Sequence, residues 1–316
     1  MFLINPETRD PYFNLALEEV LLKSRTSDYL ILYINDPAVI IGKHQAAHRE
    51  VNTKFITENK IPVIRRISGG GTVFHDRGNL NFTFIRQSEE GKQIDFRKYT
   101  LPVINFLSSL GIDAKFEGKN DIKVDGLKIS GNAEHVYRNR VLHHGTLLFS
   151  SSIEFLNNSI RSDKSCYTTR AVDSNPSPVI NLSEKLKIFK DINEFSKELK
   201  HYFSAKIPDL GVTVISGLET EEAALLAEAR YRKWEWNFAY GPEYVFKNAF
   251  MLDDEPHCCI LHIKDGIVFN CTIDGNDKMK SASEKLVGLR HMVPDFLNMF
   301  EKENISISEE EIFNFF

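Results

Sequence analysis

Cysteine, tryptophan and long apolar runs are scarce in this sequence. Its 316 residues include four cysteines and two tryptophans. The cysteines are Cys166, Cys258, Cys259 and Cys271. They form no Cys-x-x-Cys pair, so neither a zinc ribbon nor a disulfide scaffold is expected, and a reducing compartment is indicated. No run approaches the roughly 18 uninterrupted apolar residues of a membrane-spanning helix, and residues 1–10 lack a signal-peptide pattern. We therefore expect a cytoplasmic protein without a membrane partner.

An excess of positive charge is also missing. Lysine and arginine number 39 against 44 for aspartate and glutamate, which leaves a net charge of −5. Binding a nucleic-acid backbone requires a basic face, so no nucleic-acid partner is expected. The content of 42% hydrophobic and 26% charged residues is that of an ordinary globular protein. At about 150 residues per domain, the length predicts two domains.

The spacing of apolar residues predicts helices mixed with mostly antiparallel strands, which is the α+β class. Asp10 followed by Pro11 predicts the capped start of a helix over 11–23. Further helices are expected over 101–110, 192–203 and 220–233, the last capped by Thr220. Strands are expected over 30–34, 38–41, 61–67, 79–85 and 146–149. The alternation in 79–85 indicates one buried face, and the aliphatic-poor residues 160–177 are expected to form a loop.

A domain boundary is expected at Gly241-Pro242, which divides the chain into a large domain over 1–243 and a small accessory domain over 250–316. The small domain is expected to contain strands over 259–263 and 267–273 around Asp265-Gly266, helices from Ser283 and Pro294, and a short helix from Ser308 with Glu311 at capping-box spacing.

A β-hairpin is expected over 121–130. Asp125-Gly126 between two alternating runs favours a type I′ turn, because both central residues of that turn have positive φ. The register that follows from this turn places Lys128 opposite Lys123 on the polar face, near Asp121. Two facing lysines are unfavourable unless an anion lies between them. We interpret Lys128 as a candidate catalytic residue that holds a phosphate or acyl phosphate while charge develops. A solvated strand lysine is the alternative.

The segment 65–76 contains three consecutive glycines, Gly69 to Gly71, between strand-like flanks. Without Cβ atoms, their backbone N–H groups can approach a phosphate or carboxylate closely. The spacing is neither that of the Gly-Lys-Ser/Thr phosphate loop nor that of Gly-x-Gly-x-x-Gly. A tight turn beside two surface arginines is the alternative, and the neighbouring Arg66, Ser68 and His75 favour a binding site.

Three further groups are candidates because of their chemistry. Asp121 offers a carboxylate of the kind that binds Mg²⁺ together with phosphate oxygens, although a solvent-facing turn residue is the simpler interpretation. His143 and His144 can bring an imidazole beside a substrate, but they have no metal-ligand spacing with His75. Cys166 is a candidate thiol nucleophile, and nothing in the sequence around it indicates activation.

Several of these segments together resemble the lipoate–protein ligase A family. They are Arg65 to Asp76, Asn120-Asp121-Ile122, Lys128 to Gly131, His143 to Thr146 and Trp234 to Phe238, with 14–19 and 39–42 near the start. The resemblance covers nearly the whole chain and is looser after about Phe250. It implies the fold of biotin protein ligases and a reaction in two steps. Lipoate and Mg-ATP give lipoyl-AMP and pyrophosphate, and the lipoyl group then passes to a lysine of an acceptor domain.

The resemblance also implies roles for individual residues. ATP or the adenylate would be contacted by Arg66, Gly71, Thr72, Val73, Phe74 and Lys128. Lipoate would be contacted by Ser68, Gly69, Gly70, His75, Lys128 and His144, and Mg²⁺ would be held by Asp121. Residues 160–177 match the place of the family's adenylate-covering loop. This chain has Lys119 where the family usually has arginine, and lysine lacks the bidentate geometry of a guanidinium.

The partners that the resemblance implies are lipoyl domains of 2-oxo acid dehydrogenase acyltransferase subunits and the glycine-cleavage H protein, with lipoate or octanoate as the small-molecule substrate. A monomer is expected. Two alternatives stay open. An octanoyl or lipoyl transferase would need no ATP and would use Cys166 as its nucleophile. A non-catalytic lipoate-binding module would be expected to lack Lys128 or Arg66, and both are present.

Overall fold

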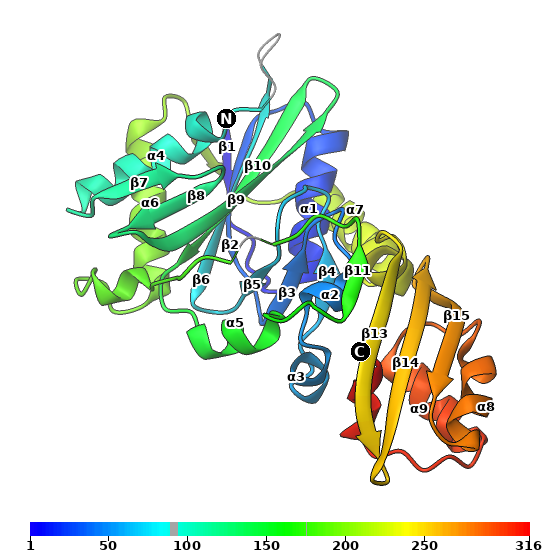
Figure 1. The fold of residues 1–316 in the computed structure, drawn as a ribbon. Coiled ribbons are helices and arrows are strands. Elements are labelled where there is room, and N and C mark those ends of the chain that lie inside the picture. Colours follow the sequence, from blue (N-terminus) through cyan, green and yellow to red (C-terminus); the bar gives the residue numbers. More distant parts are fainter. Residues whose placement is uncertain (89–93, 175) are drawn as a thin grey trace.

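The computed structural model describes residues 1–88, 94–174 and 176–316. Within these ranges the strands form three sheets, which are covered by helices (Figure 1). Most neighbouring strands pair in the antiparallel sense. The predicted α+β class is therefore confirmed.

The largest sheet has eight strands in the order β12-β1-β2-β6-β10-β9-β8-β7. Their bounds are Gly211–Thr213 (β12), Phe2–Ile4 (β1), Tyr29–Ile34 (β2), Asn79–Gln87 (β6), Arg140–Leu148 (β10), Leu127–Tyr137 (β9), Asp121–Val124 (β8) and Ala114–Glu117 (β7). The first three strands in this order are parallel. The predicted hairpin is β8–β9, and it lies beside β10, which carries the histidine pair.

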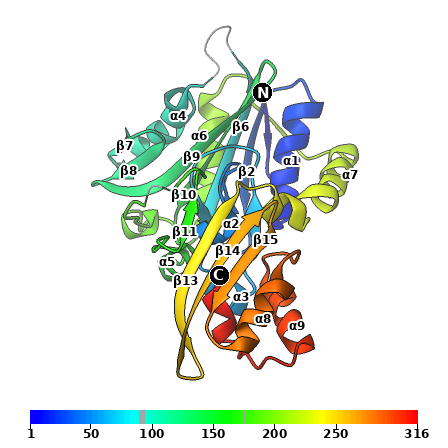
Figure 2. The ribbon, with the colours of Figure 1, turned by 45° about the vertical axis from the view of Figure 1, so that its right-hand side comes forward.

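Helices pack on both faces of this sheet (Figures 1 and 2). On one face lie α4 (Phe96–Ser109) and α6 (Ile192–Lys206), whose Phe106 and Phe203 join the core formed with Leu32 and Phe82. On the other face lie α1 (Pro11–Ser24), α7 (Gly217–Leu226) and the π-helical turn η2 (Ala227–Tyr231). None of the described helices combines the length and apolarity that crossing a membrane requires.

A small sheet in the order β4-β3-β5 presents the glycine-rich segment. Its strands are Val63–Arg65 (β4), Ala38–Ile41 (β3) and Val73–His75 (β5), and the helices near it are α2 (Ala47–Glu50), α3 (Thr53–Glu58) and α5 (Ile153–Ser159). Residues 66–72 connect β4 to β5 and contain the three glycines. The turn at 35–37 connects β2 of the large sheet to β3 of the small sheet, and these two strands do not pair with each other.

The C-terminal part has its own sheet and core. The sheet order is β11-β13-β14-β15, with bounds Tyr167–Thr169, Tyr244–Leu252, Glu255–Lys264 and Ile267–Asp274. Helices α8 (Asp277–Leu286) and α9 (Val293–Lys302) and the 3₁₀ turn η4 (Glu311–Phe315) pack on it. The short helical turns η1 (Leu182–Glu184) and η3 (Glu235–Ala239) precede it in the chain. The strand β11 comes from the segment predicted as a loop, so this segment joins the C-terminal sheet through pairing with β13 (Figure 2).

Several element boundaries differ from those predicted. Helix α4 begins at Phe96, five residues early, because Asp95 caps it. Ser216 and Glu219 form the capping box of α7, so the cap predicted at Thr220 is wrong. Strand β10 begins at Arg140 and not at residue 146, α8 begins before Ser283, and β13 was not predicted.

The strand β6 differs in a way that matters for the site. Its alternation predicted one solvent face, but residues 79–85 are buried on both faces. The polar side chains of Asn81 and Thr83 bond to the Tyr33 carbonyl and to Glu18, respectively. An alternating pattern cannot distinguish solvent from a second buried layer, and here that layer is polar.

Candidate active site

A cavity of about 940 Å³ lies between the glycine-rich segment, the hairpin β8–β9, the strand β10 and residues 172–174 and 176–178. Of the predicted site residues, it is lined by Arg66, Gly70, Gly71, Thr72, Val73, His75, Asp121, Lys128 and His144. Ser68, Gly69 and Phe74 do not line it. Ser68 is buried behind the lining, and Phe74 packs into the core on the far side of the small sheet. Tertiary structure thus brings residues from three separate segments to one cavity.

Arg66 is a buried cation at the wall of the cavity. Its guanidinium donates to the carbonyls of Ile40 (3.1 Å), Gly69 (2.6 Å) and Gly71 (2.7 Å), which shapes the glycine segment around the side chain. Burial lowers the pKa of Arg66 to about 10. This value is still well above neutral pH, so the side chain keeps its positive charge. A buried positive charge held by neutral carbonyls creates an anion-binding environment.

A chain of hydrogen bonds connects Arg66 to a buried carboxylate. Arg66 Nε donates to Ser68 Oγ at 2.9 Å, and Ser68 Oγ lies 2.6 Å from His144 Nε2. His144 Nδ1 lies 2.9 Å from Glu18 Oε2. Because a carboxylate only accepts, we assign the proton to Nδ1, and Nε2 then accepts the Ser68 hydroxyl proton. The Tyr33 hydroxyl donates to Glu18 Oε1 at 2.8 Å, so both carboxylate oxygens are used.

His75 faces the same cavity as a neutral ring. The Asn35 amide lies 3.0 Å from Nδ1, which suits an accepting Nδ1 and leaves the proton on Nε2. Burial, with smaller contributions from His144 and Arg66, lowers the pKa of His75 to about 3. The ring can therefore offer an N–H donor to a ligand throughout the neutral pH range.

Lys128 and Asp121 form an ion pair of 2.8 Å at the mouth of the cavity. The predicted pairing of Lys128 with Lys123 is confirmed. The register shifts by one residue beyond it, so Asp121 faces Gly131, and an added Cβ on Gly131 would lie 3.1 Å from Lys128 Nζ. Lys123 lies 3.6 Å from Glu117, and Lys119 also lines the cavity. Three lysines against the two carboxylates of Asp121 and Glu117 leave a positive balance at this mouth, which favours an anion.

The residues present suit Mg²⁺ only as a partner of phosphate oxygens. The described part of the chain contains no cluster of three or more His, Cys, Asp or Glu side chains placed to hold a metal. Asp121 contributes one carboxylate, and magnesium is commonly bound by one or two carboxylates plus substrate phosphates and water. The donor set therefore fits an ion that arrives with a nucleotide.

Part of the cavity wall is apolar. It is formed by Leu15, Ile40, Val73 and Ala133, with the ring of Tyr33. An apolar wall beside a few convergent polar groups is the usual composition of a small-molecule site. The cavity can therefore take a ligand with an aliphatic body and an anionic end.

Two of the candidate groups, His143 and Cys166, lie outside the cavity and pack within the structure. His143 points away from the cavity, bonds to Glu134 and Asn132 at 2.9 and 3.2 Å, and stacks on Tyr99. Burial lowers its pKa. Cys166 packs at the edge of the C-terminal core, with its sulfur 4.0 Å from the Asn248 amide oxygen, and does not line the cavity. No cysteine lines the cavity within the described residues, which argues against a thiol-dependent transferase.

Sequence reasoning missed the polar residues behind the cavity wall. Glu18 lies within a helix whose other buried residues are mostly apolar, and its charge in that pattern was an available signal. Asn35, Gln45 and Glu50 are in turns or short helices and carry no periodic signal. Their partners are remote in the chain, so only the tertiary structure reveals them.

Comparisons with known proteins agree with this geometry. Residues 10–204 match the family model described as the lipoyl protein ligase A/B catalytic domain. The lipoate–protein ligase LplJ of Bacillus subtilis is 37% identical over 283 residues, which cover 87% of this chain and 85% of that protein. The chain belongs to the lipoate–protein ligase family. The lipoate–protein ligase 1 of Staphylococcus aureus is 33% identical over 322 residues and aligns with 100% of this chain and 95% of its own.

Solved structures of lipoate–protein ligases share the fold. A bipartite ligase from Thermoplasma acidophilum, studied with its E2 lipoyl domain, is 28% identical, has a TM-score of 0.65, and covers 75% of this chain and 95% of its own. A lipoate–protein ligase A bound with ATP is 28% identical, has a TM-score of 0.65, and covers 75% of this chain and 97% of its own. The enzyme described here is thus a ligase of the family that acts on lipoate with ATP.

Proposed function

We propose that this enzyme joins lipoate to a lysine of a lipoyl-acceptor domain through lipoyl-AMP. The observation that carries the proposal is the position of Arg66 and Lys128 at one cavity that also has an apolar wall. The cations suit a carboxylate and phosphates, and the apolar wall suits the aliphatic body of lipoate. Family membership and the ATP-bound relative support the use of ATP.

In the first step, a carboxylate oxygen of lipoate attacks the α-phosphorus of ATP, and the bond to pyrophosphate breaks. We assign the nucleotide to Arg66, Gly71, Thr72, Val73, Phe74 and Lys128. Of these, Phe74 contributes only through the backbone, since its side chain is in the core. We assign lipoate to Ser68, Gly69, Gly70, His75, Lys128 and His144, with Ser68 orienting His144 and Arg66 from behind the wall. Lys128 stabilises the negative charge that develops between the two ligands.

In the second step, an acceptor lysine amine attacks the acyl carbon, an amide C–N bond forms, and AMP leaves with the C–O electron pair. The attacking amine loses a proton. Because the acyl group is already activated, the enzyme needs no nucleophilic side chain of its own and contributes mainly orientation. This agrees with the absence of a cysteine from the described cavity lining.

Mg²⁺ would neutralise phosphate charge in the first step, and Asp121 is the residue that we assign to it. The 2.8 Å ion pair of Asp121 with Lys128 keeps the carboxylate beside the phosphate site. Lys119, which also lines the mouth, supplies a point charge to the same anion.

We further propose lipoyl domains of 2-oxo acid dehydrogenase acyltransferase subunits and the glycine-cleavage H protein as acceptors, and a monomeric, cytoplasmic enzyme. The relative studied with its lipoyl domain supports this class of acceptor, and free cysteines suit a reducing compartment. We propose the division into a catalytic domain over 1–243 and an accessory domain over 250–316. A core formed mostly by residues of the C-terminal part supports that division, and Ala46 and Tyr167 of the larger part also join it.

The deciding experiment is intact-mass analysis of an unmodified lipoyl domain incubated with the enzyme, lipoate and Mg²⁺, with and without ATP. We expect a lipoyl mass gain only with ATP. A gain without ATP from an acyl-carrier donor, abolished in Cys166→Ala, would instead establish a transferase. Binding of lipoate without any mass gain from either donor would establish a binding module.

The variant Lys128→Ala tests the assigned mechanism. Removing a cation that stabilises developing charge is expected to lower the ligation rate by about 100-fold or more. Lys115→Ala is the matched control, because Lys115 lies on the adjacent hairpin strand β7, is exposed, and bonds to Asp113 at 2.8 Å. Equal rates for Lys128→Ala and the control would exclude the proposed role of Lys128.

A further inference from the structure

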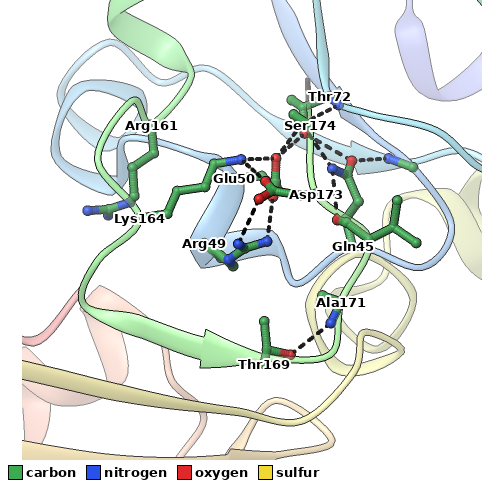
Figure 3. A network of polar contacts seen from close by, with 12 residues as sticks. Gln45, Arg49, Glu50, Thr72, Arg161, Lys164, Thr169, Ala171, Asp173 and Ser174 are labelled. Atoms are coloured by element: carbon green, nitrogen blue, oxygen red, sulfur yellow. Dashed lines mark hydrogen bonds and ion pairs between the residues drawn. The ribbon is translucent and has the colours of Figure 1, made fainter. Parts of the chain in front are cut away.

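Residues 161–174, here named the covering segment, pass between the C-terminal sheet and the active site. The segment forms β11 against β13 and then returns to the cavity, where Val172, Asp173 and Ser174 join the lining. Figure 3 shows its Lys164, Asp173 and Ser174 pointing toward Glu50, with Thr72 of the glycine segment beside them. The covering segment therefore meets the glycine segment at a group of polar side chains.

Ser174 makes the direct contact with the glycine segment. Its hydroxyl oxygen accepts the backbone N–H of Thr72 at 2.9 Å and the side-chain amide of Gln45 at 3.0 Å. A Cβ on Gly71 would lie 3.1 to 3.3 Å from the Cα, Cβ and Oγ atoms of Ser174, so a side chain at position 71 would press on Ser174. Ser174 thus packs against Gly71 and Thr72, which we assign to the nucleotide site.

The carboxylate of Glu50 contacts both Ser174 and Thr72. The Glu50 side chain is fully buried, and Oε2 accepts the Ser174 hydroxyl and the Lys164 ammonium at 2.8 Å. Oε2 also lies 3.3 Å from the Thr72 hydroxyl, which shares its hydrogen with the nearer Gln45 Oε1 at 3.0 Å. One carboxylate oxygen therefore joins α2, the glycine segment and the covering segment. A buried carboxylate is costly unless it is paired, and two of the groups that pair with Oε2, Lys164 and Ser174, belong to the covering segment, whereas Oε1 has no hydrogen-bond partner among the described residues.

Two further charges complete the cluster. Lys164 also contacts Asp173 at 2.8 Å, and Arg49 contacts Asp173 at 2.9 Å and Glu50 at 3.6 Å. The four charges sum to zero and alternate in sign around the cluster. Asp173 is the exposed member, while Glu50 is at the centre, so most of the anchoring depends on Glu50.

We propose that Glu50 is a positioning residue that keeps the covering segment on the glycine segment and thereby shields the acyl-adenylate from water until the acceptor amine arrives. The inference rests on the proposed function and adds to it the group that anchors the cover. Glu50 acts through Ser174 and Thr72 and does not line the cavity itself. Excluding water from a reactive intermediate is a known use of loops that cover an active site.

The protected reaction has a simple competitor. Water can attack the acyl carbon of lipoyl-AMP, form a C–O bond, and release AMP with the electron pair of the broken bond. The products are lipoate, AMP and a proton, so ATP is consumed without ligation. The ratio of AMP released to acceptor lipoylated therefore reports how well the intermediate is covered.

The experiment measures that ratio for the wild-type enzyme, Glu50→Gln and Ser174→Ala, with excess lipoyl-acceptor domain. We expect each variant to raise AMP released per lipoylated acceptor by about threefold or more, because its covering segment detaches more often. Ser174→Ala leaves the buried charge in place, so it decides the question if Glu50→Gln does not fold.

Two control variants match the lost groups. Thr169→Val removes a hydroxyl of the same segment that bonds to Glu243 and Ala171 and not to the glycine segment. Glu310→Gln removes an exposed carboxylate that pairs with Lys54. Both are expected to keep the wild-type ratio.

A second readout needs no nucleotide. Limited trypsin digestion after the exposed Arg170 is expected to be faster in Glu50→Gln and Ser174→Ala than in the controls. An unchanged AMP ratio in Ser174→Ala and in folded Glu50→Gln would overturn the proposal even if the overall rate fell. If the wild type showed no ATP-dependent ligation, the proposed function would fail, and unchanged trypsin rates would separately refute the anchoring by Glu50.

Discussion

At the scale of single residues, buried charges from distant parts of the chain organise the site. A series of hydrogen bonds runs from Arg66 through Ser68 and His144 to Glu18, with a positive charge at one end and a carboxylate at the other. Each bond in this series constrains the proton position of the next, so the tautomer and orientation of His144 depend on a carboxylate that lies behind the cavity wall. The residue that orients the site is therefore not one that touches the ligand.

The variant Glu18→Gln tests this dependence. An amide that donates to His144 Nδ1 would force the opposite ring tautomer and break the chain. We expect the ligation rate to fall by about tenfold or more and the free energy of unfolding to fall by about 2 kcal/mol. Enzyme assays on folded protein and urea unfolding give both quantities.

Glu19→Gln is the control for this variant. Glu19 is the next residue of α1 and is equally buried, but it bonds to Lys23 and Tyr231 at 2.6 and 2.7 Å, away from the cavity. It should lose stability while keeping the ligation rate within about twofold. A similar fall in rate for both variants would show that the effect of Glu18 is only a loss of stability.

The residues that touch the cavity were largely predictable, and those behind its wall were not. The glycine run and Lys128 carry local signals, since a missing Cβ and a strand register can be inferred from neighbouring residues. Glu50 depends on Lys164 and Ser174, more than 100 positions away. No local pattern encodes such a distance.

At the scale of elements, the two Asp-Gly turns show what a local sequence does and does not determine. Asp125 and Gly126 have φ of 52° and 78°, and Asp265 and Gly266 have φ of 50° and 69°. Both turns thus have the positive φ pair that the sequence predicts. Their surroundings differ, because Gly126 is open to space whereas Gly266 packs on Trp234 and Ala239.

Replacing each of these glycines by alanine should separate the two effects. Gly126→Ala is expected to cost about 1 kcal/mol, the strain of positive φ alone. Gly266→Ala should cost about 2 kcal/mol more, since its Cβ would lie 2.7 Å from the Trp234 ring and 3.0 Å from the Ala239 backbone. Urea unfolding of both variants measures the difference, and equal losses would mean that the Trp234 contact yields without cost.

At the scale of the whole molecule, α2 connects the C-terminal core to the active site. Its Glu50 anchors the covering segment, and its His48 lies against the C-terminal part, with Nε2 2.7 Å from the His291 carbonyl. His291 in turn bonds to Tyr244 at 2.7 Å and to the Phe315 carbonyl at 2.6 Å. Both rings are buried and burial lowers the pKa of each, so this contact is made by neutral histidines.

The neutral histidines predict that the protein loses stability in acid. Burial lowers the pKa of His291 to about 4 and that of His48 well below 6.5. Below about pH 6.5 the unfolded chain binds protons that the folded chain does not, so stability present above that pH is lost as the pH falls toward 4. His291 alone accounts for about 3 kcal/mol over this window.

Urea unfolding between about pH 7.5 and about pH 4.5 measures this loss. His291→Gln is expected to be less stable than the wild type at the higher pH and to depend less steeply on pH. His201→Gln, at an exposed position on α6, should keep the wild-type slope. A wild-type slope in His291→Gln would show that other groups cause the acid loss.

The sequence by itself determined the helix after Asp10, the two Asp-Gly turns, the glycine segment and the facing pair of Lys123 and Lys128, because each depends on backbone preferences and side-chain spacing over a few residues. Only the tertiary structure decided that β2 and β3 enter different sheets, that β6 is buried on both faces, and that β11 joins the C-terminal sheet. Those outcomes depend on which surfaces meet, and a pattern of polar and apolar residues is the same whether water or a buried carboxylate satisfies its polar face.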